Sequence, residues 1–193
     1  MPARSPEIAV QHTLASLQVL GERFPGSLER VRSRLGPEVR AALDGAVRSD
    51  FLPAAVDVGL ALAIVAELGL PAARGVARES LRRNFTGTLL GALLRSAQAL
   101  FGPTPAGVLR WADRGWSRIC RDCGTMRLVG SDGEVLTLEL EGIPAAIDVP
   151  DYLEAVGGGL EGLLDACGVD GTATVDRTDG RLRYVLRPVE PRP

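Results

Sequence analysis

The sequence predicts an α+β fold: an N-terminal helical bundle, then a hairpin, a helix and a second hairpin, with the hairpins forming a four-stranded antiparallel sheet. Up to residue 120, apolar residues recur at helical spacing between proline and glycine breaks. After Gly124, apolar and polar residues alternate in two pairs of short segments. The 193 residues fit one domain at 1–187, with a helical part at 7–120, a sheet part at 124–187 and a proline-rich tail at 188–193.

The first helices are bounded by residues that commonly begin or end helices. An opening helix carries Ile8 and Leu20 and ends near Gly21. Ser27 is expected to cap a second helix, and Pro37 to lie in the first turn of a third.

The segment 51–70 is the longest apolar stretch, and its helix at 53–68 is apolar on nearly every side. Such a helix lies either at the centre of a fold or in an interface. Asp57 and Glu67 interrupt the stretch, which leaves too few apolar residues to cross about 30 Å of hydrocarbon. We therefore expect no membrane span.

Residues 72–101 predict one or two further helices, which the Gly-Pro-Thr-Pro segment at 102–105 ends. Thr104 is expected to cap the next helix, with Pro105 in its first turn and with Trp111 and Trp116 along its length.

Two hairpins and one helix complete the predicted domain. The first hairpin joins 126–129 to 135–140 through a turn at 131–133, and the second joins 173–175 to 182–186 through a turn at 178–180. Between them, Asp151 is expected to cap a helix that Gly168 closes.

The charged residues exclude several functions. All 22 basic residues are arginine, so lysine Schiff-base chemistry and a P-loop are excluded. Residues 1–120 carry 15 arginines and 10 acidic residues, and the rest carry 7 and 14, which predicts either two electrostatic poles or two differently solvated faces. The longest arginine run is the Arg82-Arg83 pair, so no nucleic-acid partner is expected. The absence of an apolar leader and the three cysteines favour a cytoplasmic location.

The segment 157–162, Gly-Gly-Gly-Leu-Glu-Gly, matches a dinucleotide-binding pattern. The chain that follows is too short for the two halves of such a fold, and Pro150-Asp151 indicates the start of a helix. We interpret the glycines as a site of close packing against another helix or strand.

Cys120 and Cys123 form a C-x-x-C pair. A redox pair is favoured at a helix N-terminus, whereas this one is expected at the end of the tryptophan helix. A zinc site would need Cys167 and His12 as well, and a haem would need His12, the only histidine. The alternative is that the cysteines are small buried apolar residues.

Four residues are candidates for a ligand pocket. Thr88 lies near Phe85, so these two side chains could line a cavity, although packing between helices explains the small residues around them as well. Trp111 and Trp116 are five positions apart and do not share a helix face, so one can face the core and the other a pocket or a partner.

Several motifs together resemble a known superfamily. They are Phe85-x-x-Thr88-Leu89-Leu90-Gly91, Leu100-Phe101-Gly102-Pro103, the tryptophan segment with its hairpin, and Gly159-x-x-Gly162-Leu163-Leu164 before a final hairpin. The order is similar to a myxobacterial family of about 200-residue proteins of unknown function. That family resembles haem-NO-binding domains, TRAPP vesicle-tethering subunits and 4-vinyl-reductase domains.

The resemblance implies a ligand-binding or protein-interaction domain that is often dimeric. The defining residues of each branch are missing here. No histidine lies in the middle helices, where the haem-binding branch has one. No cysteine lies in the last hairpin or in the early helices, where the other two branches carry theirs.

We therefore expect a non-catalytic module with a signalling or regulatory role, acting as a homodimer without a cofactor and binding an apolar small molecule or a protein partner. The alternative is a metal or haem sensor that uses Cys120, Cys123, Cys167 and His12. An enzyme would have to rely on carboxylates such as Asp148, Asp151 and Glu154.

Overall fold

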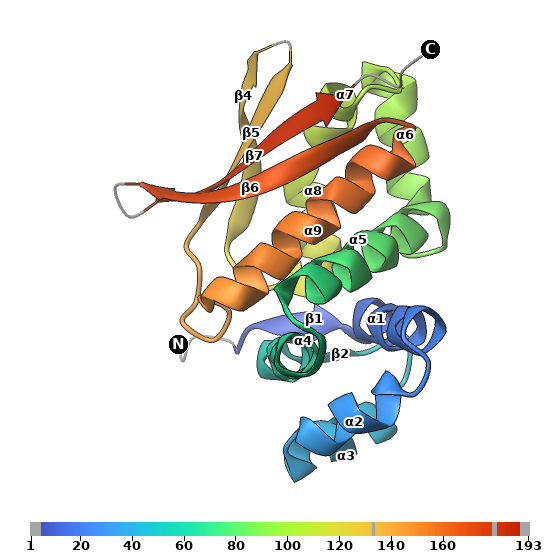
Figure 1. Ribbon diagram of the computed structural model, residues 1–193. Helices are drawn as coiled ribbons and strands as arrows, with labels where there is room; N and C mark the ends of the chain where they lie inside the picture. Colours follow the sequence, from blue (N-terminus) through green and yellow to red (C-terminus); the bar gives the residue numbers. More distant parts are fainter. Residues whose placement is uncertain (1–4, 133, 179–180, 190–193) are drawn as a thin grey trace.

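The computed structural model describes residues 5–132, 134–178 and 181–189, and Figure 1 shows their arrangement. The N-terminal half contains β1, α1, α2, α3, β2, α4 and α5, at Glu7–Ala9, Val10–Arg23, Ser27–Arg34, Pro37–Asp44, Phe51–Pro53, Ala54–Leu68 and Leu70–Thr86. Then follow α6, α7, α8, β3, β4, β5, α9, β6 and β7, at Gly91–Phe101, Pro105–Leu109, Ala112–Ile119, Cys120–Arg121, Thr125–Asp132, Val135–Glu141, Pro150–Ala166, Asp170–Thr178 and Arg181–Val189.

The predicted α+β layout is confirmed. The two hairpins join through β5 and β7 into an antiparallel sheet of order β4-β5-β7-β6. The register pairs Leu138 with Tyr184 at the centre of the sheet, where both side chains are buried. Helix α9 lies along the sheet and α5 lies beside α9 (Figure 1).

The structure contains a second, small sheet that was not predicted from the sequence. It has the order β2-β1-β3, and β1 pairs antiparallel with both neighbours. Ile8 was expected in the opening helix but lies in β1 opposite Leu52 and Cys120, where it is 1% exposed. The helix therefore begins at Val10 rather than at Ile8.

Some predicted helix caps and helix boundaries differ from those in the structure. Gly26, with φ of 81°, is the N-cap of α2, and Ser27 is its first residue. Val149 is the N-cap of α9, so Asp151 lies in its first turn, where a carboxylate favours the helix dipole. The tryptophan helix is divided into α7 and α8. Thr104 caps α7 as predicted, because its hydroxyl accepts a hydrogen bond from the Gly107 amide at 3.1 Å.

The first two residues of the expected proline-rich tail, 188 and 189, belong to a strand instead. Strand β7 continues to Val189, with Pro188 opposite Gly171 at the edge of the ladder. The remainder of the expected tail, 190–193, and the turn residues 133 and 179–180 lie outside the described residues.

Helix α4 borders both hydrophobic cores of the protein. Ala54 and Val58 belong to the core beneath the large sheet, and Leu60 and Ile64 belong to the core shared with α1, α2 and α5. The apolar character on all sides is thus explained by burial within one chain, as the first of the two interpretations predicted. The homodimer stays a prediction. None of the described helices has both the length and the apolar character needed to cross a membrane.

The glycines of α9 let its backbone touch that of α5. A Cβ atom on Gly158 would lie 2.5 Å from the Arg74 carbonyl oxygen, and one on Gly162 would lie 2.0 Å from that of Arg78. The glycine-rich segment is a helix-packing motif, as interpreted from the sequence.

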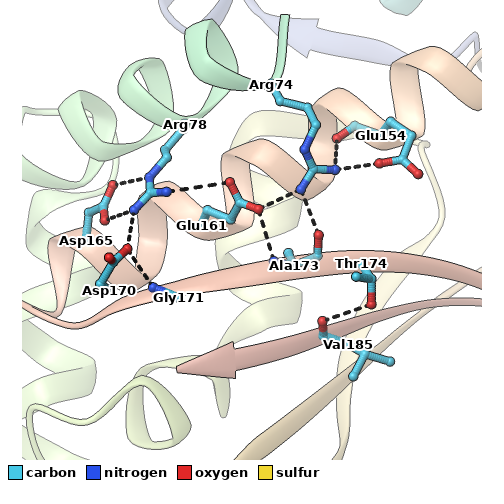
Figure 2. Close-up of polar contacts among 10 residues, drawn as sticks. All are labelled: Arg74, Arg78, Glu154, Glu161, Asp165, Asp170, Gly171, Ala173, Thr174 and Val185. Carbon is cyan, nitrogen blue, oxygen red and sulfur yellow. Dashed lines mark hydrogen bonds and ion pairs between the residues drawn. The ribbon is translucent and has the colours of Figure 1, made fainter. Parts of the chain in front are cut away.

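Two arginines of α5 reinforce this contact (Figure 2). Arg74 donates to Glu161 at 2.6 Å and, beyond α9, to the Ala173 carbonyl at 2.7 Å. Arg78 forms a bidentate pair with Asp165 at 2.6 and 2.7 Å. These charge-assisted hydrogen bonds link α5, α9 and β6.

Candidate functional site

An apolar cavity of about 120 Å³ lies among α1, α4, α5, α6, α8 and α9. Its wall is mainly aliphatic and aromatic, with contributions from Leu60, Phe85, Leu94, Trp116, Met126 and Leu160. An apolar cavity of about 150 Å³ in another protein stays dry and admits benzene. The space here therefore suits a molecule of about one small ring.

The Trp116 side chain provides an unpaired hydrogen-bond donor in this wall. Its indole Nε1 is buried and has no hydrogen-bond partner among the described residues. Buried polar groups nearly always have a partner, and leaving one without costs about 1–3 kcal/mol. An acceptor group on a bound molecule would recover this cost.

His12 enters the wall from α1, and Asn84 of α5 fixes its ring. The Asn84 amide nitrogen lies 2.9 Å from Nδ1 of His12. Because an amide N–H donates, Nδ1 is the acceptor in this contact.

A buried carboxylate, Asp57 of α4, also belongs to the wall but has its hydrogen bonds satisfied. Thr13 donates to Oδ1 at 2.7 Å, and the Tyr152 hydroxyl donates to Oδ2 at 3.1 Å. Burial raises the pKa of Tyr152 well above its usual value, and the negative charge of Asp57 adds to the shift. Tyr152 is therefore a neutral donor that ties α9 to α4.

The candidate pocket residues separate into two groups. Phe85, Trp111 and Trp116 line the cavity. Thr88 is exposed, does not line it, and accepts a hydrogen bond from the Gln11 side chain at 2.9 Å.

The candidate metal ligands do not assemble into a site. Cys120 lines the cavity, the Cys123 thiol donates to the Arg121 carbonyl at 3.2 Å, and Cys167 caps the C-terminal end of α9. Across the part of the chain that the structure describes, no three histidine, cysteine or acidic side chains are grouped to hold a metal ion.

The carboxylates considered for an enzyme are also dispersed. Asp148 pairs with Arg177, and Glu154 pairs with Arg74 at 2.5 Å. Asp151 is exposed in the first turn of α9.

The sequence did not predict that His12 and Asp57 belong to one wall. Asp57 carried a signal, because it is a lone acid near the start of an otherwise apolar helix. The approach of Asn84 to His12 spans 72 positions and has no counterpart in local sequence.

No family model and no curated protein matches the chain. Solved structures do match over nearly its whole length. An H-NOX protein from K. algicida, described as Fe(II) unliganded, has 10% identity and a TM-score of 0.65, covering 95% of this chain and 98% of its own. An oxygen-binding H-NOX domain related to soluble guanylate cyclases has 12% identity and a TM-score of 0.57, with coverages of 95% and 96%.

The chain has the H-NOX fold. A variant of the T. tengcongensis H-NOX protein agrees, with 14% identity, a TM-score of 0.55 and coverages of 95% and 99%. These matches confirm the resemblance to haem-NO-binding domains at the level of the fold, and they do not extend it to function. The links to TRAPP subunits, to 4-vinyl-reductase domains and to the myxobacterial family stay predictions.

Proposed function

We propose that this chain is a haem-free ligand-binding domain on the H-NOX fold. Its cavity holds an apolar molecule of about one small ring that carries a hydrogen-bond acceptor, such as a carbonyl oxygen. The observation that carries the proposal is the buried indole N–H of Trp116, a residue of the cavity wall, which has no hydrogen-bond partner among the described residues. The other polar groups described above, at His12, Asp57 and Tyr152, already have partners within the protein.

The size of the cavity argues against a haem. Pockets for drug-sized ligands have volumes of roughly 300–1,000 Å³. A haem needs a pocket of at least this volume, whereas the volume of this cavity is about 120 Å³. Among the residues that the structure describes, the cavity wall also contains no arginine that could pair with haem carboxylates.

The wall also lacks a side chain ready to bind iron. Axial ligands in haem proteins are histidine, cysteine thiolate, tyrosine or methionine. His12 accepts a hydrogen bond at Nδ1, and burial raises the pKa of the Cys120 thiol well above its usual value, which keeps it protonated. Tyr152 is held by Asp57, so Met126 alone is without such a restraint.

A ligand in this cavity would act as a regulatory signal through the helices. The wall combines α1 and α4 of the N-terminal half with α8 and α9, which cover the large sheet. Filling the cavity therefore favours one packing of these helices over alternatives, which is the physical basis of a sensor.

Cyclopentanone and cyclopentane test the proposal, because they share a ring and differ in one acceptor. Both are expected to raise the midpoint of urea unfolding, and titration calorimetry should show the ketone binding about tenfold more tightly. Trp116→Phe keeps the aromatic ring and removes the donor, so it should abolish the ketone preference while leaving cyclopentane binding unchanged.

Trp111→Phe is the matched control, because Trp111 also lines the cavity and its ring packs edge-to-face on Phe101 at 5.8 Å. It should retain the ketone preference. The proposal is wrong if neither compound binds the folded protein, or if the ketone preference survives in Trp116→Phe.

A further inference from the structure

We propose that a groove between α7 and β4, called the basic groove below, binds a short acidic segment of a partner protein. Its wall includes Phe101, Arg110, Trp111, Asp113, Arg127 and Leu128. Its volume of about 700 Å³ is within the range of pockets that hold a molecule of drug size. Because Trp111 also lines the ligand cavity, the basic groove lies on the outer side of the same wall. Binding in the groove requires no ligand in the cavity.

The arginines of the basic groove have no carboxylate partners. Arg110 and Arg127 are exposed and form no ion pair or hydrogen bond with any residue that the structure describes. Many other arginines of the chain are paired, as Arg78 is with Asp165 at 2.6 Å. Among the described residues of the groove wall, Asp113 alone is acidic. The groove therefore has an excess of positive charge that an acidic partner would neutralise.

Aromatic rings hold two guanidinium groups at this surface. The guanidinium of Arg110 lies 5.5 Å from the centre of the Phe101 ring, and that of Arg114 lies 4.4 Å from the centre of the Trp111 ring. A guanidinium stacked on a ring can still direct its N–H groups at a carboxylate. The Phe101 side chain is 39% exposed, so it also offers apolar surface. Carboxylates that flank a large apolar side chain match this arrangement.

The hollow shape of the surface favours a peptide segment over a membrane. A peripheral protein that binds an anionic bilayer inserts an apolar helix face into it or presents basic residues to its surface. Here Arg110 and Arg127 instead border a groove in which Leu128 is half-buried. A peptide can enter such a groove and place its carboxylates against both guanidinium groups, where charge-assisted hydrogen bonds form.

Fluorescence anisotropy on the folded full chain, with no ligand added, tests the proposal. The probe is a fluorescein-labelled peptide with the sequence Ser-Glu-Asp-Leu-Phe-Glu-Asp-Ser. It should bind, and raising sodium chloride from about 50 to about 500 mM should weaken the binding, because salt screens exposed charges. A second peptide with lysine in place of every acidic residue should bind at least about tenfold more weakly, since its charges oppose those of the groove.

Three variants locate the binding surface. Arg110→Glu and Arg127→Glu should each weaken binding of the acidic peptide about tenfold. Arg40→Glu is the matched control, because Arg40 is an exposed residue of α3 without an ion pair among the described residues, and α3 lies at the opposite end of the molecule (Figure 1). It should change the affinity by less than about twofold. Circular dichroism verifies that each variant is folded.

The proposal is overturned if the acidic peptide does not bind, if the lysine peptide binds as tightly, or if Arg40→Glu weakens binding as much as the groove variants. Sedimentation with vesicles of phosphatidylcholine and about one-third phosphatidylserine tests the membrane alternative. Vesicle binding that is lost in Arg110→Glu, together with no peptide binding, would show that this surface meets a membrane instead of a protein.

Discussion

The Asn84 amide nitrogen donates a hydrogen bond of 2.9 Å to Nδ1 of His12, across the space between α5 and α1. The only histidine of the chain is thereby restrained in the wall of the cavity. Because Nδ1 accepts this hydrogen bond, its lone pair is directed at Asn84.

Haem titration is the first prediction. Adding haemin to the purified protein should give no saturable Soret band of ligated haem, and His12→Ala should give the same spectrum, because the cavity of about 120 Å³ is too small for a haem and Asn84 restrains the His12 ring. A stoichiometric Soret band that disappears in His12→Ala would show that the histidine binds iron after all.

The close contact between α5 and α9 predicts that adding one methyl group to a glycine of α9 will strongly destabilise the fold. Gly162→Ala places a Cβ 2.0 Å from the Arg78 carbonyl oxygen, so the two backbones must move apart. The free energy of unfolding, measured in urea, should fall by more than about 2 kcal/mol. The matched helical control is Gly21→Ala, whose Cβ would meet only Leu28 at 3.8 Å. It should leave stability unchanged or raise it by up to about 1 kcal/mol.

The Glu79 carboxylate predicts a loss of stability in acid. Its hydrogen bonds with Arg82 and then Arg83 lower its pKa from 4.5 to about 2. Since the pKa is lower in the folded state, the stabilisation is complete above about pH 4.5 and is lost as the pH falls towards 2. Urea unfolding from pH 6 down to about pH 2 should therefore show a shallower decline in Glu79→Gln than in the unmodified chain. Equal slopes for both proteins would contradict this account.

Much of the fold was predictable because its signals are local. The alternation at Leu136, Leu138 and Leu140 predicts a half-buried strand, and all three side chains are buried in β5. The small sheet was missed because its strands have only two or three residues, too few for any periodicity. The break at Arg110 and Trp111 has no proline or glycine to mark it, so one helix was predicted where two exist.

The candidate site was less predictable because it depends on distant contacts. Phe85 was proposed beside Thr88, and the two tryptophans because they do not share a helix face. Phe85, Trp111 and Trp116 all line the cavity. The polar part of the wall depends on pairs that are far apart in sequence, such as Thr13 and Asp57, which are separated by 44 positions. No local pattern predicts that such residues meet.

The indole N–H resonance of Trp116 gives the most direct test of the central claim. The chain has two tryptophans, so a proton–nitrogen correlation spectrum contains two indole signals, and Trp116→Phe identifies which belongs to Trp116. Titration with cyclopentanone should move the Trp116 signal downfield to a saturating position, because the N–H gains an acceptor, while cyclopentane should leave it without that shift. A Trp116 signal that does not respond to the ketone would contradict the account.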